Sequence, residues 1–385
     1  MKKNKKLKVL HVVGSMNRAG TETMLMNVYR SIDRKKVQFD FISYSKQEAH
    51  YDQEIQSLHG KIITLTKTNS IKQIYDAIKK HGPYDVVHAH TLFHGGMVSL
   101  AAFFAKVKIR IAHAHTTSDK EDSYVRKLYI IGMRLFILMF STTLLACSKE
   151  AGRYLFGKRS LIKGKVTYFP NMIDYSKFLH VPETKVNTFK LTQGLGNQGI
   201  VIGHIGTFKE SKNHAFIIDM MTYIVEKEPN VHLLLVGDGE LKDEIQTKTN
   251  QKGLHRHVQF IGNSEDIPTI LHSMDVFVFP STYEGLGLVL LEAQASGVPC
   301  IVSEAIQPEA DLGLKLLEKI SLAKGPEVWA ERIVQIADKT EMNTQKITAA
   351  FQRNGYSLKE GITDLMMIYN WNAGGTYEQN ANRNR

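Results

Sequence analysis

A glycine-rich stretch in the second half of the chain decides the fold, and it reads Pro280-Ser281-Thr282-Tyr283-Glu284-Gly285-Leu286-Gly287-Leu288-Val289-Leu290-Leu291-Glu292-Ala293. It follows the apolar run Val276 to Phe279, which predicts a buried parallel strand. It continues into an apolar segment that ends before Gly297 and Pro299, as helices commonly end. The order strand, turn, helix directs backbone N–H groups from the positive end of a helix toward one place, which suits a phosphate. An ordinary strand-to-helix connection has the same order, so the turn alone leaves both interpretations open.

Two carboxylates accompany this turn. Glu284 lies within it, and Glu292 lies about two helical turns further on. A carboxylate beside an anion site is poorly placed for phosphate, but it is well placed for the hydroxyl groups of a sugar or ribose. The stretch therefore favours a ligand that carries both phosphate and sugar.

The length and composition indicate a two-domain protein that needs no disulfide bonds. The 385 residues exceed one usual hydrophobic core, and 43% hydrophobic with 23% charged residues is ordinary for a globular protein. Cys147 and Cys300 fall in separate apolar runs, which is typical of a reducing cytosol. The apolar run Leu7 to Val13 is too short for a signal-peptide core, so we expect a cytoplasmic protein.

The charge is divided unevenly along the chain. Residues 1–190 hold 32 Lys and Arg and 14 Asp and Glu, a net charge of +18, whereas residues 191–385 hold 17 and 24, a net charge of −7. A uniformly basic chain would suggest nucleic acid. A basic half joined to an acidic half predicts instead that one domain meets an anionic partner, either a membrane leaflet or a polyanionic substrate.

Strands and helices alternate along the chain, which predicts an α/β protein with doubly wound parallel sheets. In the first half, strands are predicted at Leu7–Gly14, Val37–Tyr44, Ile62–Leu65, Val86–His90, Ile109–His115, Thr143–Ser148 and Lys165–Pro170. In the second half, they are predicted at Gly199–Thr207, His232–Gly239, Val258–Gly262, Val276–Pro280 and Pro299–Ser303. This restart predicts two Rossmann-like domains facing each other across a cleft.

The domain boundaries follow from polar and glycine-rich segments. We expect a first domain over 1–180, a polar linker over 181–197 and a second domain over 198–355. A last helix over 356–371 is expected to cross back to the first domain, followed by a flexible tail over 372–385. The apolar segment from Lys127 to Ala146 is too short in its uncharged part to span a membrane and predicts a buried or interfacial helix.

Two predicted strands of the first domain end in His-x-His, at His88 and His90 and at His113 and His115. Residues i and i+2 of a strand point to the same side. Four histidines at one sheet edge could form a zinc site, although no carboxylate or cysteine accompanies them at ligand spacing. We favour a polar site in which one histidine forms a hydrogen bond to the substrate.

The motifs together resemble one family, the GT-B-fold retaining glycosyltransferases of glycosyltransferase family 4, and within it the bacterial exopolysaccharide-cluster enzymes of the EpsF type. The resemblance covers roughly Val9 to Tyr369. Its most specific motif is Glu284-x7-Glu292. The others are the run Gly206 to Asn213, the run Leu235 to Gly239, and the helix start Gly20-Thr21-Glu22.

The resemblance implies a role for each residue of these motifs. The leaving nucleoside diphosphate gains negative charge during transfer, and Lys212 would neutralise it as a point charge. Glu284 would hold hydroxyl groups of the donor sugar, and Glu292 those of the ribose. His115 would lie near the donor sugar and the acceptor, so that His115, Glu284 and Lys212 are the catalytic candidates. The remaining donor-binding candidates supply backbone, and they are Gly20, Gly206, Thr207, Gly237, Gly285, Leu286, Gly287 and Leu288.

Two positions depart from the family pattern. Thr207 stands where the family usually has Arg, so one diphosphate cation is missing, and the nearby Lys209 is a candidate replacement. Met172 replaces the glycine of the family's Pro-Asn-Gly turn, which concerns backbone geometry. The chain has no Asp-x-Asp motif, so no metal and no other cofactor is expected for the transfer.

The resemblance also implies the partners. We expect a nucleoside-diphosphate sugar as donor, with UDP favoured, and a lipid-linked oligosaccharide as acceptor in exopolysaccharide, biofilm or capsule synthesis. The basic first domain would dock on an anionic membrane as a peripheral protein, and other polysaccharide-synthesis proteins are further candidate partners. Two alternatives stay open at this point, namely a non-catalytic nucleotide-sugar-binding subunit and a GT-B epimerase acting on a UDP-sugar.

Overall fold

The computed structural model describes residues 6–67, 69–116, 123–196, 199–284, 286–337 and 343–370. Within these ranges the chain forms two compact units. Unit 1 contains the residues up to Ile173 and those from Gly355 onward, and unit 2 contains Asp174–Asn354. The predicted tail over 372–385 lies outside the described residues.

Unit 1 is built on a seven-stranded parallel sheet with the order β3-β2-β1-β4-β5-β6-β7. The strands are β1 (Leu7–Val12), β2 (Val37–Ser43), β3 (Ile62–Thr64), β4 (Val86–Ala89), β5 (Ile109–Ala114), β6 (Thr143–Ala146) and β7 (Val166–Tyr168). The connecting helices are α1 (Gly20–Ser31), α2 (Asp52–Ser57), α3 (Ile71–His81), the 3-10 turn η1 (Leu92–His94), α4 (Gly95–Phe104), α5 (Tyr124–Phe140), α6 (Lys149–Phe156) and α7 (Lys158–Ile162).

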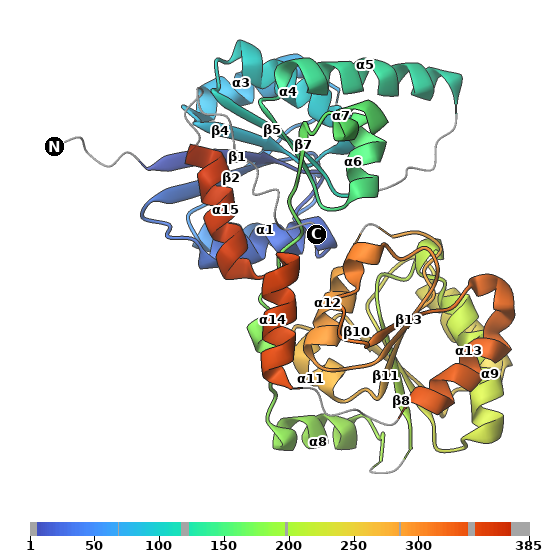
Figure 1. The fold of residues 1–385 in the computed structure, drawn as a ribbon. Coiled ribbons are helices and arrows are strands. Elements are labelled where there is room, and N and C mark those ends of the chain that lie inside the picture. Colours follow the sequence, from blue (N-terminus) through green and yellow to red (C-terminus); the bar gives the residue numbers. More distant parts are fainter. Residues whose placement is uncertain are drawn as a thin grey trace. The chain divides into compact units, whose positions relative to one another are not determined.

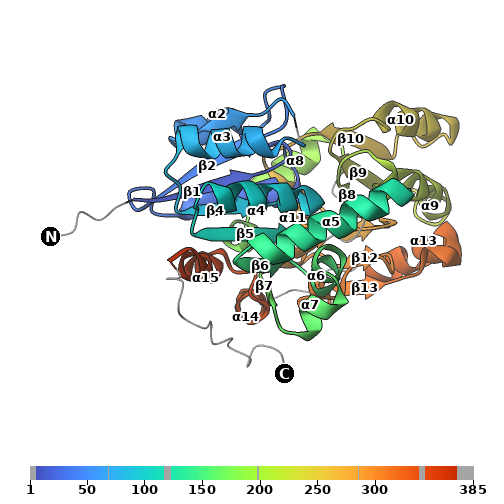
Figure 2. The same ribbon diagram turned by 90° about the horizontal axis from the view of Figure 1, so that it is seen from above.

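Alternating side chains of the central strands divide unit 1 into two faces. Leu10 and Val12 of β1 and Val87 and Ala89 of β4 pack with α3 and α4 in one core. The residues between them, among them His11, point to the opposite face, because successive strand residues alternate. Figure 1 shows α3, α4 and α5 on one side of the sheet and α1 and α15 on the other, and Figure 2 shows α4 and α5 running over the strands from above.

Unit 2 repeats the same topology with six parallel strands in the order β10-β9-β8-β11-β12-β13. The strands are β8 (Val201–Ile205), β9 (His232–Val236), β10 (Val258–Gly262), β11 (Val276–Phe279), β12 (Cys300–Val302) and β13 (Leu317–Lys319). The helices are η2 (Tyr175–Phe178), α8 (Glu183–Thr192), η3 (Glu210–Lys212), α9 (His214–Lys227), α10 (Lys242–Gln251), α11 (Ile267–His272), α12 (Leu288–Ala295), η4 (Pro308–Ala310), η5 (Leu322–Lys324), α13 (Gly325–Ile336) and α14 (Thr344–Asn354).

The core of unit 2 lies between its sheet and the helices α9 and α13. Leu233 and Leu235 of β9 alternate inward and meet Met221 of α9 and the fully buried Trp329 of α13 in one cluster. The indole N–H of Trp329 donates to the carbonyl of Ser321 at 3.3 Å, so the largest core side chain is also satisfied as a donor. The α/β prediction of two parallel Rossmann-like sheets is confirmed.

The chain crosses between the units at positions other than the predicted linker. The first crossing follows Ile173, and the segment predicted as a linker over 181–197 contains α8, which belongs to unit 2. The return crossing lies before Gly355, whose φ of +76° suits glycine between α14 and the last helix, α15 (Leu358–Asn370).

Helix α15 packs on unit 1, as the sequence predicts for a C-terminal helix that crosses back. Tyr369 is almost fully buried, and its hydroxyl lies 2.8 Å from Nδ1 of His88. Met172 is fully buried against the same helix, because Gly361 has no Cβ there, and a Cβ would overlap the Met172 sulfur. The methionine that replaces the family glycine therefore serves as a packing contact for α15.

Of the two alternatives predicted for helix α5, buried or interfacial, the structure excludes a buried helix. Of its residues only Ile137 is buried, and most of its large apolar side chains are exposed. Among the described residues, none of the helices is long and apolar enough to cross a membrane.

Candidate functional site

The carboxyl ends of β8 and β11 lie side by side at the centre of the sheet of unit 2. The strand order reverses between these two strands, and in open α/β sheets ligands bind outside the carboxyl ends at such a reversal. The loop that follows β8 carries Gly206 to Asn213, and the loop that follows β11 carries the glycine-rich stretch from Pro280. The fold thus brings the two most specific sequence motifs to the same edge.

Backbone and side-chain hydrogen bonds join these two loops. The amide of Thr282 donates to the carbonyl of Ser211 at 2.9 Å, and the side-chain amide of Asn213 donates to the carbonyl of Pro280 at 3.2 Å. Asn213 reaches this position with a left-handed backbone, at φ +57°, which asparagine tolerates better than most residues. Lys212 lies between Ser211 and Asn213, the two residues of its loop that form these hydrogen bonds. Its backbone is therefore fixed on both sides.

Lys212 and Glu284 form an ion pair between the two loops. The side chains are only 12% and 20% exposed. The Lys212 ammonium also lies 4.4 Å from the centroid of the Phe279 ring, at cation–π distance. A positive charge is therefore fixed at the carboxyl edge by a carboxylate on one side and an aromatic face on the other.

Two glycines of the predicted site allow the turns after β8 and β9 to touch. Gly237 has φ +132°, and a Cβ there would overlap the carbonyl of Gly206. The amide of Gly206 donates to Val236 at 2.9 Å and that of Gly237 to Gly262 at 2.9 Å, so the edge is continuous across three strands. The stem of Lys212 lies against Gly206, where a Cβ would be 3.4 Å from Lys212 Cδ.

The N-terminus of α12 completes this edge. Gly287 is its N-cap at φ +71° and has no side chain to cap the helix. Leu286 and Leu288 are buried, so any contact they make with a ligand is through the backbone. Gly285, which the sequence predicts as a further donor, lies outside the described residues.

Glu292 lies in the second turn of α12 and is half-buried. Loss of hydration raises the pKa of its carboxyl to about 7. Near neutral pH this group is therefore divided between its acid and carboxylate forms, and a hydrogen-bond donor such as a hydroxyl would favour the carboxylate.

Thr207 and Lys209 are both exposed in the loop after β8. Their backbones are tied together, because the amide of Lys209 donates to the carbonyl of Thr207 at 2.8 Å. The position where the family usually has Arg thus faces solvent, with a lysine two residues away.

The remaining predicted residues, Gly20 and His115, belong to unit 1. Gly20 is exposed and is the first residue of α1, whose N-cap Ala19 has no side-chain cap. His115 follows β5, and its Nδ1 lies 3.1 Å from Oδ1 of Asn171. His113, two residues earlier, is fully buried and faces the carbonyl of Phe169 at 3.4 Å, so His115 is the accessible member of the pair.

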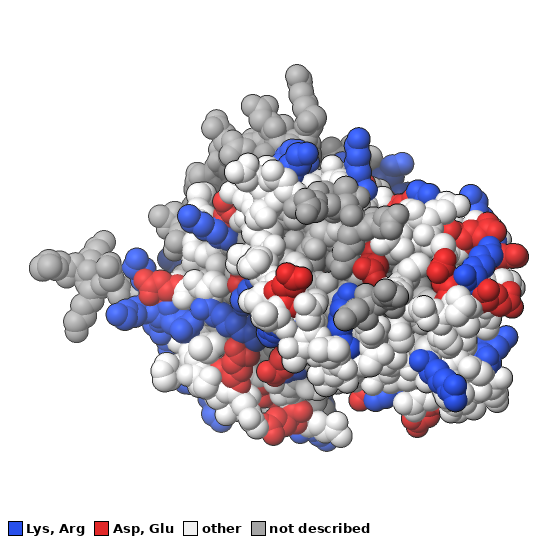
Figure 3. All heavy atoms as spheres, turned by 90° about the horizontal axis from the view of Figure 1, so that it is seen from below, with Lys and Arg blue, Asp and Glu red and all other residues white. Residues whose placement is uncertain are grey.

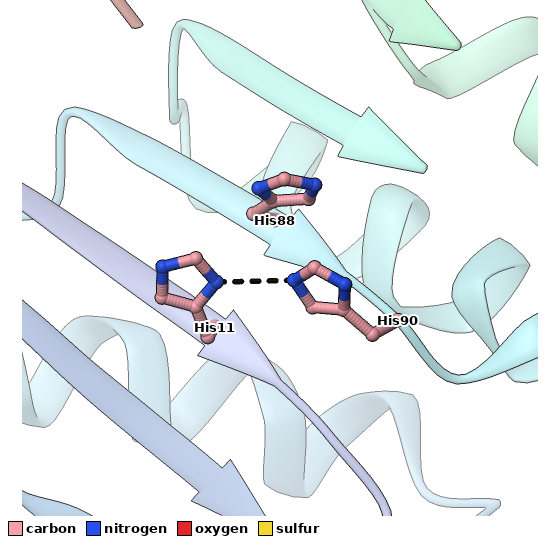
Figure 4. Close-up of side chains that lie close together, drawn as sticks. All are labelled: His11, His88 and His90. Atoms are coloured by element: carbon pink, nitrogen blue, oxygen red, sulfur yellow. Dashed lines mark hydrogen bonds between the residues drawn. The ribbon is translucent and has the colours of Figure 1, made fainter. Parts of the chain in front are cut away.

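Five histidines of unit 1 gather on one face of its sheet, at the carboxyl ends of β1, β4 and β5. They are His11, His88, His90, His113 and His115. His115 Nε2 lies 2.8 Å from His90 Nδ1, and His90 Nε2 lies 3.1 Å from His11 Nδ1. Figure 4 shows His11 and His90 facing each other beside His88.

These histidines are neutral at physiological pH, because burial opposes the charged form. Desolvation lowers the pKa of His11 to about 3 and that of His115 to about 4. It also holds the pKa values of the other three well below the usual range. The predicted polar site therefore offers uncharged nitrogen atoms.

The sequence interpretation missed several residues of both edges. Phe279 was assigned to a buried strand, and its contact with Lys212 has no sequence signal. His11 is not part of a His-x-His motif, and Asn171 lies in a turn, so neither has a sequence signal for the site. The order of the strands in the sheet places His11 beside His90 and Asn171 beside His115. His204 of β8 is buried beside Gly206 and forms a hydrogen bond with the carbonyl of Val278 at 2.9 Å through its Nδ1.

The fold and these motifs agree with two family models that together span most of the chain. The Glycosyltransferase Family 4 model matches residues 18–177, and the model of glycosyl transferases group 1 matches residues 188–353. A relative from Bacillus subtilis (strain 168), named as the glycosyltransferase EpsF, is 39% identical over 370 residues, which are 94% of this chain and 96% of the relative. The chain therefore belongs to glycosyltransferase family 4 and is an enzyme of that family.

A second glycosyltransferase relative and two solved structures are also similar to this chain. The capsular polysaccharide biosynthesis glycosyltransferase CapH of Staphylococcus aureus is 27% identical over 342 residues, which cover 86% of this chain and 91% of CapH. The crystal structure of HepE from Anabaena in complex with UDP-glucose has a TM-score of 0.74 at 17% identity and covers 94% of this chain and 98% of HepE. That of WaaG, a glycosyltransferase involved in lipopolysaccharide biosynthesis, has a TM-score of 0.67 at 15% identity, over 95% and 100% of the two chains. These likenesses confirm the predicted GT-B fold.

Proposed function

We propose that this enzyme transfers a hexose from a nucleoside-diphosphate sugar, with UDP as the favoured nucleotide, to a lipid-linked or oligosaccharide acceptor in exopolysaccharide or capsule synthesis. The transfer proceeds with retention of configuration and uses no metal ion. The observation that carries the proposal is the Lys212 ammonium held at the carboxyl edge between Glu284 and Phe279.

The charge at this edge fits a departing diphosphate. An ammonium group has three N–H donors, so the ion pair with Glu284 leaves donors for phosphate oxygens. The uncapped N-terminus of α12 adds backbone donors and a positive helix end, and Gly287 lets a ligand approach it closely. Because these groups are already fixed, they stabilise the leaving charge without reorganisation.

The two carboxylates have separate tasks in this proposal. Glu284 accepts hydrogen bonds from hydroxyl groups of the donor sugar while it orients Lys212. Glu292 accepts from the ribose, and that contact favours its ionised form. His115 contributes an uncharged nitrogen toward the transferred sugar or the acceptor, and Gly20 and Gly237 bring backbone close to the donor.

The relatives support the choice of donor and acceptor class. HepE binds UDP-glucose in its crystal structure. A relative from Escherichia coli, 29% identical over 260 residues and 65% of each chain, is named as a galactosyltransferase that acts on a sugar linked to diphosphoundecaprenol and takes galactose from UDP. By analogy, we propose a UDP-sugar and a polyprenyl-diphosphate-linked acceptor for this enzyme.

Binding and transfer assays test the proposal together. A panel of UDP- and GDP-sugars in a thermal-shift assay should raise the Tm with UDP-sugars most. The best donor should then label a lipid-linked acceptor, and Lys212→Ala and Glu284→Ala should abolish the labelling. Absence of a shift with every nucleotide-sugar, or labelling that survives both substitutions, contradicts the proposed site.

The acceptor of this proposal lies at a membrane, and unit 1 carries a surface suited to an anionic leaflet. An apolar strip runs along α5, in which each member is more than half exposed. The members are Tyr124, Val125, Leu128, Ile131, Leu135 and Met139. Phe103 and Phe104 at the end of α4 extend the strip, because Phe103 contacts Phe140 at a ring-centroid distance of 5.2 Å.

The charged residues within α5 have one sign. Within α5 there are Arg126, Lys127 and Arg134 and no acidic residue, and the exposed Lys106 and Lys108 follow α4. Unit 1 as a whole holds 32 Lys and Arg and 15 Asp and Glu, a net charge of +17, whereas unit 2 holds 17 and 23, a net charge of −6. Figure 3 shows one face of the molecule, on which both signs occur together with a continuous run of Lys and Arg at one side.

We therefore propose that the α5 strip inserts into an anionic lipid surface as a peripheral contact. Liposome flotation should recover the enzyme with anionic vesicles, less at moderate than at low salt. The double variant Leu128→Asp/Ile131→Asp should lose this recovery. Leu191→Asp on α8, where the leucine is 67% exposed, is a matched control that should keep it. Equal recovery with neutral and anionic vesicles overturns the docking proposal but leaves the donor site untouched.

A further inference from the structure

The histidine face of unit 1 offers more nitrogen atoms than hydrogen bonding uses. Among the described residues, Nε2 of His11, Nε2 of His88 and Nδ1 of His113 are buried without a partner. A buried polar atom without a partner costs about 1–3 kcal/mol. Of these three atoms, Nδ1 of His113 is the one whose lone pair the ion proposed below would accept.

We propose that His90, His113 and His115 bind one divalent transition-metal ion of the Zn²⁺ type. One ring nitrogen from each of the three lies within 4.8 Å of the others. His90 is on the segment that follows β4, His113 is in β5 and His115 follows β5, so all three come from the rigid carboxyl edge of the sheet.

The identity of the three ligand atoms follows from the bonds made by the opposite nitrogen of each ring. His115 Nδ1 meets Asn171 Oδ1, which leaves Nε2, and His113 Nε2 meets the carbonyl of Phe169, which leaves Nδ1. His90 Nε2 meets Nδ1 of His11, which leaves Nδ1. Metal-binding histidines almost always donate their other ring N–H in this way, and the acceptors here are an amide oxygen, a backbone carbonyl and an imidazole nitrogen.

The spacing needs only a small adjustment. His90 Nδ1 and His115 Nε2 lie 2.8 Å apart and share a proton. Two nitrogens bound to one tetrahedral ion at about 2.0–2.1 Å are roughly 3.3 Å apart, so the rings need to separate by about half an ångström. The ion takes the place of the shared proton. That proton moves to Nε2 of His90 and the one on Nδ1 of His11 to its Nε2, so no proton leaves the protein.

A second set of histidines, His11, His88 and His90, also has one nitrogen each within 4.8 Å. It shares His90 with the first set, so the two sets cannot both be filled. Either set leaves a buried N–H on His11 without an acceptor among the described residues, so this cost does not separate them. The first set is half-open, since His90 and His115 are partly exposed, and solvent can supply the fourth ligand, whereas His11 and His88 of the second set are buried.

An ion at this site has a consequence for the enzyme, and this step rests on the proposed role of His115. His115 Nε2, the ring nitrogen that does not meet Asn171, lies 2.8 Å from His90 Nδ1, so a substrate hydroxyl must displace that hydrogen bond, and a bound ion would prevent the exchange. The ion would thus inhibit transfer and leave nucleotide binding in unit 2 unchanged.

Metal titration of the full chain tests the site without reference to activity. After treatment with a chelator, the protein should bind one Co²⁺ with the visible absorption of a tetrahedral site, and Zn²⁺ should displace it. His113→Ala and His115→Ala should each weaken binding about 100-fold or more, and Asn171→Ala about 10-fold. His88→Asn is the matched control, because it changes a buried histidine outside the proposed set, and it should keep the Co²⁺ spectrum.

The substituted residues lie in unit 1, whereas a UDP-induced thermal shift reports on unit 2, so far-UV circular dichroism of the full chain identifies the variants that are folded. A folded His113→Ala protein that still gives the tetrahedral Co²⁺ spectrum overturns the proposal. Loss of binding in His88→Asn with retention in His113→Ala also overturns it, because the ion would then occupy the other set. If Co²⁺ binds as expected but Zn²⁺ leaves transfer unchanged, the metal site stands and the role of His115 is wrong.

Discussion

The two sheets have the same strand order but present opposite chemistry where that order reverses. At the edge between β8 and β11, unit 2 fixes a full positive charge on Lys212 beside the carboxylate of Glu284. At the edge between β1 and β4, unit 1 gathers neutral imidazoles on His11 and His90. In both units the fold creates a candidate binding site where the strand order reverses. The side chains at that site decide whether it presents a charged group or a neutral nitrogen with a lone pair.

The difference follows from how each group is compensated. At Lys212 a carboxylate and an aromatic ring replace the water that the ammonium group loses on burial. The histidines have no carboxylate partner among the described residues, so desolvation lowers the pKa of His115 to about 4 and the ring loses its charge instead.

The largest expected effect is the loss of transfer activity when the positive charge at the edge of unit 2 is removed. Lys212→Ala removes the positive charge opposite the leaving group, and kcat/KM should fall about 10²–10³-fold, as for the loss of one oxyanion donor. Lys209→Ala, three residues away and exposed, is the matched control and should change kcat/KM less than about threefold. Steady-state transfer assays with the best donor measure both.

His115→Ala should also lose transfer but keep the UDP thermal shift, which separates the two edges. A larger loss in Lys209→Ala would assign the diphosphate to the other lysine.

The next effect tests the close contact of two turns in unit 2. Gly237→Ala places a Cβ on the carbonyl of Gly206 at φ +132°, so the free energy of unfolding should fall by about 3 kcal/mol or more and UDP binding should be lost. Gly253→Ala has φ +72° but nothing within 4 Å of its Cβ, so it should cost only about 1 kcal/mol. Urea unfolding measures both values. Equal costs would show that backbone conformation alone decides and that the contact with Gly206 is unimportant.

Much of this architecture could be predicted from the sequence, because it is written in local patterns. The apolar strands, the restart of the βα order and the motif from Glu284 to Glu292 indicated two Rossmann-like sheets of the GT-B class. The helix over 183–192 was missed because its segment has almost no apolar face, and none of its residues is buried. For α5 the sequence left a buried and an interfacial helix open, because an apolar segment is more often core than surface.

The side-chain contacts of the site were less predictable, because they join residues that are far apart in the chain. The pair Lys212–Glu284 spans 72 residues, and the contact of His88 with Tyr369 spans 281. No local pattern reports such a separation. The same holds for Met172, whose departure from the family turn is explained only by the absent Cβ of Gly361.

A pH dependence sharpens the comparison between the two edges. The pKa of Glu292 is raised from 4.5 to about 7 in the folded protein, so the folded state binds more protons than the unfolded state between these values. Its contribution to stability is therefore complete below pH 4.5 and is lost as the pH rises through 7, by on the order of 3 kcal/mol. The buried histidines have lowered pKa values, so their contribution to the free energy of unfolding has the opposite pH dependence. It is lost as the pH falls below 6.5.

Glu292→Gln removes the titrating group and keeps its shape. Urea unfolding at pH 5 and at pH 8.5 should show wild type losing this free energy relative to Glu292→Gln at the higher pH. UDP affinity of the wild type should rise over the same interval, because the carboxylate is the form that accepts from ribose. A wild type and a variant that keep the same difference at both pH values would mean that Glu292 is ionised throughout.

The smallest effect tests the helix that covers only unit 1. A Cβ at Gly361 overlaps Met172, so Gly361→Ala should destabilise the protein by about 1–3 kcal/mol through overpacking under α15. Gly132→Ala in α5 is the matched control, because that helical glycine has nothing within 4 Å of its Cβ and alanine there should stabilise by about 0.5–1 kcal/mol. Unfolding by urea gives both values.

The same change in a Met172→Ala background decides whether Met172 is the cause. The shorter side chain leaves room for the Cβ, so Gly361→Ala should then approach the behaviour of Gly132→Ala and become neutral or stabilising. A cost that persists in this background would place the obstruction elsewhere on the sheet. In that case the methionine that replaces the family glycine would not be what seats α15 over the histidine face, and the burial of His88 beneath Tyr369 would need another explanation.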